Sequence, residues 1–171
     1  MTLQKLLAVG VLFTGNLLPT IRPELSQRGD LGEAPRIEFP SVGISQAQRE
    51  RFLDADFTVV TKVQSLPDPV LQLFIEKGGS RPVMANPDDK FEATDVVSDA
   101  SVPRMRLIFA GVWREKCFVY YEQGGRAHMY VLVLFNVNPS GIVKPLWRGY
   151  CGGPASDIPK LRAQLASGDC R

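Results

Sequence analysis

The sequence lacks the short motifs that mark the commonest catalytic, nucleotide-binding and metal-binding sites. Its double glycines, at Gly78, Gly124 and Gly152, form neither GxGxxG nor GxxxxGK[ST], so no phosphate-binding loop is predicted. Neither G-x-S-x-G nor H-E-x-x-H occurs. The single histidine and the three cysteines show no CxxC or HxxxH spacing, and the acid-rich stretch 88–99 lacks the D-x-D-x-D-G order of a calcium loop. We therefore expect no metal and no cofactor.

A surplus of one charge is also missing. The chain has 20 Lys and Arg against 18 Asp and Glu, and its basic residues are scattered rather than grouped into a stripe. Binding to nucleic acid requires such a basic face, so no nucleic-acid partner is expected. The hydrophobic content of 44% excludes a mostly disordered chain, and 171 residues fit one domain with a core of its own.

The N-terminus has no hydrophobic run long enough for a comfortable membrane span. Residues 6–21 (LLAVGVLFTGNLLPTI) follow Lys5 without any charge, but Thr, Gly, Asn and Pro interrupt them. A basic start before an apolar core of this length is typical of a secretory signal peptide, whereas a span needs about 20 apolar residues. No A-x-A-like cleavage site is visible. Residues 1–21 are therefore predicted to be a signal peptide or an N-terminal anchor; a buried N-terminal helix is the alternative.

Residues 22–44 are rich in Pro, Gly and charge and are predicted to be a disordered linker before a single domain at 45–171. Within the domain, the stretch Arg104–Cys151 alternates apolar runs with WREK, QGGR and NVNPSG. This pattern predicts four antiparallel strands in a meander. Met129–Phe135 is apolar on both alternating faces, which indicates a central strand covered on both sides.

The other elements are predicted from helix signals and β-branched runs. Ser45 caps a short, loosely held surface helix, and 57–63 forms an edge strand; 91–97 could add one short strand. A helix begins near Ser65, places Val70, Leu73, Phe74 and Lys77 on one face, and stops at Gly78. A final helix is capped by Ser156 or Asp157, buries Ile158, Leu161 and Leu165, and ends at Gly168. The predicted fold is α+β: a meander sheet of four to six strands with a central and a C-terminal helix packed on it.

The positions of the cysteines follow from the expected strand register. If Gln123 faces Ala127, Cys117 faces Val133; a symmetric second hairpin then places Cys151 opposite His128. Cys117 and Cys151 would lie about 16 Å apart, beyond the roughly 7 Å limit for a disulfide. In an oxidising compartment Cys170 therefore pairs with Cys151 or with Cys117, and we favour Cys151. The remaining thiol is expected in the core.

The same register places Glu122, His128 and Cys151 in one row on three adjacent strands. A carboxylate, an imidazole and a thiol in a row form an activated nucleophile, which predicts a small hydrolase or transferase as one candidate function. A disulfide at Cys151 would exclude it. Register slippage at Gly124 would also break the row.

The leading hypothesis is instead a non-enzymatic, exported binding or inhibitor-type module. The aromatic residues of the 104–151 stretch serve as core or, where no helix covers them, as a surface for a protein or small ligand. A third hypothesis is a structural protein tethered to a membrane through residues 6–21.

Overall fold

The domain is built on a six-stranded open sheet. The computed structural model describes residues 37–41, 43–75, 82–95, 99 and 101–171. The predicted signal segment 1–21 and residues 22–36 of the predicted linker lie outside the described residues. The longest strands are β3 (Met105–Trp113), β4 (Lys116–Gln123), β5 (Met129–Val137) and β6 (Val143–Cys151).

Each of these four strands pairs antiparallel with the next along the chain. A short strand, β1 (Thr58–Val60), pairs antiparallel with β3 and forms one edge of the sheet. Another, β2 (Met84–Ala85), runs parallel to the start of β3. The expected strand at 91–97 is wrong: described residues 91–95 form no strand, and the sixth strand is β2.

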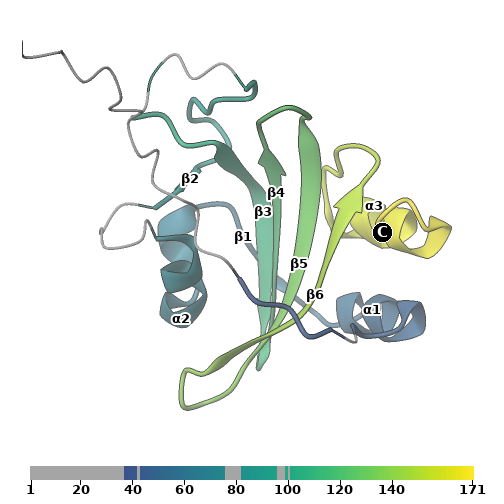
Figure 1. The fold of residues 1–171 in the computed structure, drawn as a ribbon. Helices are drawn as coiled ribbons and strands as arrows, with labels where there is room; N and C mark the ends of the chain where they lie inside the picture. The colour runs from purple at the N-terminus through teal and green to yellow at the C-terminus, as the bar shows by residue number, and fades with distance from the viewer. Residues whose placement is uncertain (1–36, 42, 76–81, 96–98, 100) are drawn as a thin grey trace, which may run out of the picture.

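Helices cover both faces of the sheet, so the fold is α+β (Figure 1). Helix α2 (Asp68–Leu71) lies over one face, which we call the α2 face. Helices α1 (Gln46–Leu53) and α3 (Ile158–Ser167) lie over the other, the α3 face. Because β4 and β5 are covered on both sides, Phe118 and Leu134 are buried on the α3 face and Val119 and Val133 on the α2 face.

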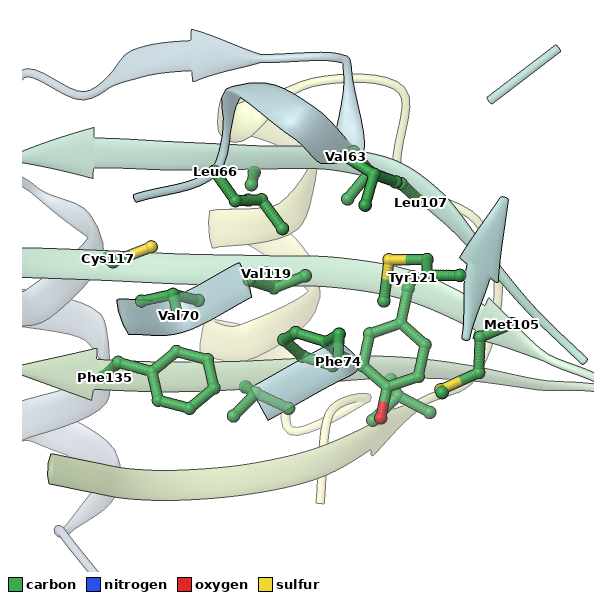
Figure 2. Close-up of a cluster of buried hydrophobic side chains, with 14 residues drawn as sticks. Val63, Leu66, Val70, Phe74, Met105, Leu107, Cys117, Val119, Tyr121 and Phe135 are labelled. Atoms are coloured by element: carbon green, nitrogen blue, oxygen red, sulfur yellow. The ribbon is translucent and has the colours of Figure 1, made fainter. Parts of the chain in front are cut away.

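The helix expected from Ser65 to Lys77 is shorter than its pattern suggests. The chain forms a 3-10 turn at η1 (Val63–Ser65), one α-helical turn at α2 and a second 3-10 turn at η2 (Gln72–Phe74). Phe74 O then accepts a hydrogen bond from Val83 N, and Ile75 forms a β-bridge with Pro82, which ends the helical path. Lys77 and Gly78 lie outside the described residues. Val70 and Phe74 still occupy the core over β4 and β5 (Figure 2).

Helix α1 starts where Ser45 predicts, but it is not a loosely held element. Ser45 Oγ accepts from Gln48 N at 3.3 Å while Gln48 Oε1 accepts from Ser45 N at 2.8 Å, a reciprocal capping box. Its last residues, Phe52 and Leu53, are buried. Arg162 of α3 donates through Nε to Leu53 O at 2.6 Å, which joins the two helices of the α3 face.

Helix α3 matches its prediction at both ends and along its face. Asp157 accepts from Lys160 N at 2.8 Å at the N-terminus, and Gly168 adopts a left-handed φ of 81° at the C-terminus. Leu161 and Leu165 are buried against the sheet. These local signals agree with the tertiary packing, so the sequence pattern was sufficient here.

The end of the predicted linker packs on the domain. Ile37 and Phe39 lie against the core of the α2 face, and Ile44 lies against the core of the α3 face. The structured part of the chain therefore extends at least eight positions before Ser45, as far as residue 37.

Candidate functional site

The register between β4 and β5 differs from the expected one by two residues. Gln123 pairs with Met129 rather than Ala127, and Cys117 pairs with Phe135 rather than Val133. Gly124 and Gly125 do not close a tight turn, because their N–H groups donate to Arg104 O and Ala93 O instead. His128 therefore lies in the connecting loop, before β5 begins.

The expected alignment of Glu122, His128 and Cys151 on three adjacent strands is therefore wrong, because His128 lies outside β5 and Cys151 pairs with Tyr130. The row that the strand pairing forms across β3 to β6 is instead Arg106, Glu122, Tyr130 and Cys151, in which each residue is paired with the next. In the β5–β6 hairpin, the pairing next to the loop, Val137 with Val143, is already one residue away from the expected register, and an irregularity between Leu134 and Phe135 adds a second. Together they place Cys151 opposite Tyr130. An extra residue in one strand changes all pairings beyond it.

Glu122 and His128 nevertheless meet, through side chains rather than through strand pairing. Glu122 Oε2 lies 2.8 Å from His128 Nε2, and Glu122 Oε1 accepts from Arg106 Nε at 2.5 Å. The Arg106 guanidinium lies 4.3 Å from the centre of the Phe91 ring, which also contacts His128. Glu122 is buried, so both of its oxygens are satisfied by cations or donors as a buried carboxylate requires. This cluster fastens the segment at Phe91 to the sheet.

Cys151 forms a disulfide with Cys170, which is the pairing that the sequence analysis favoured. The disulfide holds the C-terminal residues beside β6, where Tyr150 N donates to Arg171 O at 2.7 Å and Arg171 N donates to Tyr150 O at 3.0 Å. Cys117 is the free cysteine and is fully buried. Burial raises the pKa of the Cys117 thiol to about 12, so it stays protonated at neutral pH. Neither Cys151 nor Cys117 presents a thiolate to His128, and the cysteine-nucleophile hypothesis fails on this point.

Tyr120 shows that the α3 face is closed by polar as well as apolar contacts. Its hydroxyl donates to Gly153 O at 2.8 Å and accepts from Ala155 N at 3.1 Å, which fixes the loop before α3. Six aromatic residues of the 104–151 stretch are buried, and Tyr150 is the exposed one; the buried six are Phe109, Phe118, Tyr120, Tyr121, Phe135 and Trp147. Most of the aromatic content is therefore core, and it does not form a broad exposed surface.

The α2 face carries a cleft, which we call the Tyr121 cleft. It has a volume of about 420 Å³. It lies over β3 to β6, between η2 and residues 37–39, and is lined by Ile37, Glu38, Phe39, Leu73, Phe74, Met105, Tyr121, Gln123, Val133 and Arg148. Small-molecule sites are clefts of roughly 300–1,000 Å³ with apolar walls and a few polar groups. The Tyr121 cleft has this size and composition.

Two polar side chains of the cleft, Tyr121 and Arg148, form no hydrogen bond or salt bridge with the described residues. Tyr121 is only 5% exposed, and its hydroxyl forms no hydrogen bond with the described residues. Arg148 forms no salt bridge with them; its guanidinium lies over the rings of Phe39, at 5.1 Å, and Tyr150, at 5.6 Å. Burial raises the pKa of Tyr121 to about 12, while the nearby charge of Arg148 opposes part of that rise.

The residues of this cleft were missed from the sequence for identifiable reasons. Phe39 and Glu38 fell in a stretch assigned to a linker on its Pro and Gly content. Arg148 was counted only among the scattered basic residues, and its side chain is exposed to solvent at the side of the cleft. The alternation of β6, in which Trp147 is buried on one face, was the available signal that Arg148 points to the other.

The part of the chain that the structure describes contains no group of three or more His, Cys, Asp or Glu that could hold a metal ion. None of its helices is long and apolar enough to cross a membrane. Comparisons with protein-family models, with curated proteins and with solved structures found no match to this chain.

Proposed function

We propose that this protein is an exported, non-enzymatic, single-domain binding module whose ligand occupies the Tyr121 cleft. The observation that carries the proposal is the cleft itself. Its apolar wall contains Phe74 and Tyr121, whose rings pack edge to face at 5.9 Å (Figure 2). Its Tyr121 hydroxyl and Arg148 guanidinium have no hydrogen-bonding or ionic partner among the described residues.

The arrangement of reactive groups favours binding over chemistry. The single histidine contacts Glu122 on the α3 face, whereas the cleft lies on the α2 face. The lining of the cleft contains no Cys, Ser, Thr, Lys or His, and its one carboxylate, Glu38, is exposed to solvent. A small ligand is favoured over a large protein partner, because exposed large hydrophobic residues in the described chain are limited to Val59, Ile142 and Tyr150.

Export is supported by the uncharged run that follows Lys5 and by the Cys151–Cys170 disulfide. We propose a periplasmic or secreted bacterial protein whose segment 1–21 is a signal peptide. Intact mass of the purified protein before and after reduction tests this directly. Loss of the N-terminal segment, with a gain of two hydrogens on reduction, supports export. A mass that retains the segment supports the membrane-tethered alternative instead.

The binding proposal is tested with N-phenyl-1-naphthylamine, an uncharged apolar dye whose fluorescence rises when it leaves water. We expect saturable binding to the wild-type protein. Leu73→Trp replaces a half-buried leucine in the cleft wall with a bulky indole ring, which should fill the cleft and abolish this binding. Ile142→Trp, at an exposed site in the β5–β6 connection, is the matched control and should bind the dye as the wild type does. No saturable binding to the wild type, or equal binding by Leu73→Trp, would contradict the proposal.

A further inference from the structure

The chemical class of the ligand can be inferred from the charge and shape of the Tyr121 cleft. Apolar side chains from three sources meet there: Phe74 from η2, Met105 from β3 and Phe39 from the segment before α1. Together they provide contact for a hydrocarbon group. Burying such a group stabilises binding in proportion to the apolar area removed from water.

Arg148 gives one side of the cleft a positive charge. It projects from the edge strand β6 onto the α2 face, opposite Val133 of β5. Its guanidinium is stacked on Phe39 and Tyr150, which restricts its orientation before any ligand arrives. A guanidinium held in this way offers paired N–H donors that match a carboxylate.

Tyr121 supplies a second donor. It comes from β4, its ring packs against Phe74, and its hydroxyl has no described hydrogen-bond partner although the residue is nearly buried. The hydroxyl oxygen is not among the fully buried atoms that lack a partner, so it can donate to a ligand oxygen in the cleft in place of water. The Arg148 guanidinium has only donors and therefore selects for an acceptor group, to which the Tyr121 hydroxyl can also donate.

We propose that the Tyr121 cleft binds a single-chain amphiphile with a carboxylate head, placing the carboxylate at Arg148 and Tyr121 and the hydrocarbon chain against Phe74 and Met105. This inference rests on the proposed function and adds the ligand class. The one carboxylate in the lining, Glu38, forms no salt bridge with Arg148 and is exposed to solvent. The negative charge of Glu38 repels a bound carboxylate, so removing that charge should strengthen the binding of a carboxylate ligand.

The experiment measures displacement of N-phenyl-1-naphthylamine by decanoate, 1-decanol and decyltrimethylammonium at neutral pH. These ligands share one chain length and differ in head-group charge. Decanoate is expected to bind about tenfold more tightly than decanol, the gain typical of hydrogen bonds to a charged group. The cationic amphiphile should bind most weakly.

Four variants assign the preference to named groups. Arg148→Gln should remove most of the tenfold preference for decanoate over decanol, and Arg148→Lys should retain part of it because the charge remains. Tyr121→Phe should weaken the binding of decanoate more than that of decanol, because a hydrogen bond to a carboxylate is stronger than one to a hydroxyl oxygen. Glu38→Gln should tighten the binding of decanoate. Lys144→Gln removes one positive charge from an exposed position of the same strand and is the control for net charge.

The outcomes separate the two proposals. Dye binding with equal affinity for decanoate and decanol overturns the carboxylate assignment and leaves the binding module in place. A decanoate preference that survives in Arg148→Gln, or that falls equally in Lys144→Gln, also overturns it. Absence of dye binding contradicts the proposed function itself, and the ligand class with it.

Discussion

The Glu122 carboxylate lies 2.8 Å from His128 Nε2 although the two residues are not partners in the sheet. Glu122 pairs with Tyr130 across β4 and β5, and His128 reaches it from the loop that precedes β5. With Arg106 on its other oxygen, Glu122 joins β3, β4 and this loop through one buried carboxylate. The cluster therefore links these three parts of the chain at one end of the sheet.

Removing the charge of Glu122 should destabilise the domain. Glu122→Gln keeps the shape of the side chain but leaves Arg106 without its ion pair, and we expect a loss of about 1–2 kcal/mol in the free energy of unfolding. The Arg106 and His128 side chains are 31% and 40% exposed, so water compensates part of the lost interaction. Urea unfolding measures the change. Glu115→Gln, at an exposed turn position, is the control, and equal stability of the two variants would contradict this role.

The disulfide should contribute a measurable part of the stability. It links Cys151 to Cys170 over a sequence separation of 19 and restrains the unfolded chain. A loop of this size corresponds to about 3 kcal/mol in the chain-entropy account. The double variant Cys151→Ala/Cys170→Ala should lose about 2–4 kcal/mol in thermal or urea unfolding. It should also show faster amide exchange at Arg171, whose N–H donates to Tyr150 O. An unchanged midpoint would show that the strand contacts suffice without the bond.

Stability should fall steeply at alkaline pH. Burial raises the pKa of Cys117 from 9.0 to about 12, and that of Tyr120 and Tyr121 from 10.0 to about 12. Between pH 9 and pH 12 the unfolded chain therefore loses protons that the folded protein retains, which favours unfolding as the pH rises. Well below pH 9 these groups are protonated in both states and give no pH dependence.

The alkaline effect can be assigned to a single residue with Tyr121→Phe. Each group contributes at most about 1.4 kcal/mol per pH unit, so this variant should show a shallower decline in unfolding free energy between pH 10 and pH 12. Parallel curves for Tyr121→Phe and the wild type would show that Tyr121 ionises equally in both states.

The elements that the sequence predicts well are those whose local signals agree with their packing. Helix α3 has a capping aspartate, an apolar face and a terminal glycine, and all three take the expected roles. The strands from Met105 to Cys151 were visible because β-branched and aromatic runs alternate with turn residues. Ser45 likewise predicts the start of α1 through its capping box.

The elements that the sequence predicts poorly depend on contacts between distant segments. The loop at Gly124 and Gly125 is held by hydrogen bonds to the backbone oxygens of Arg104 and Ala93. Rules for hairpin turns consider only the two strands that the turn joins, so they do not predict these bonds. The helix near Val70 stops early because Phe74 O bonds to Val83 N. The candidate site was missed because Phe39 lies in a stretch with the composition of a linker, although its ring packs on the core and stacks with Arg148.

The central claim, a carboxylate-binding cleft between Tyr121 and Arg148, is tested most directly by mapping amide chemical shifts on a ¹⁵N-labelled sample during titration with decanoate. The account predicts saturable shifts at residues of the α2 face, including Leu73, Tyr121 and Arg148, with little change at Leu161 or Leu165 of α3. Shifts confined to the α3 face, or no saturable shifts at all, would contradict it.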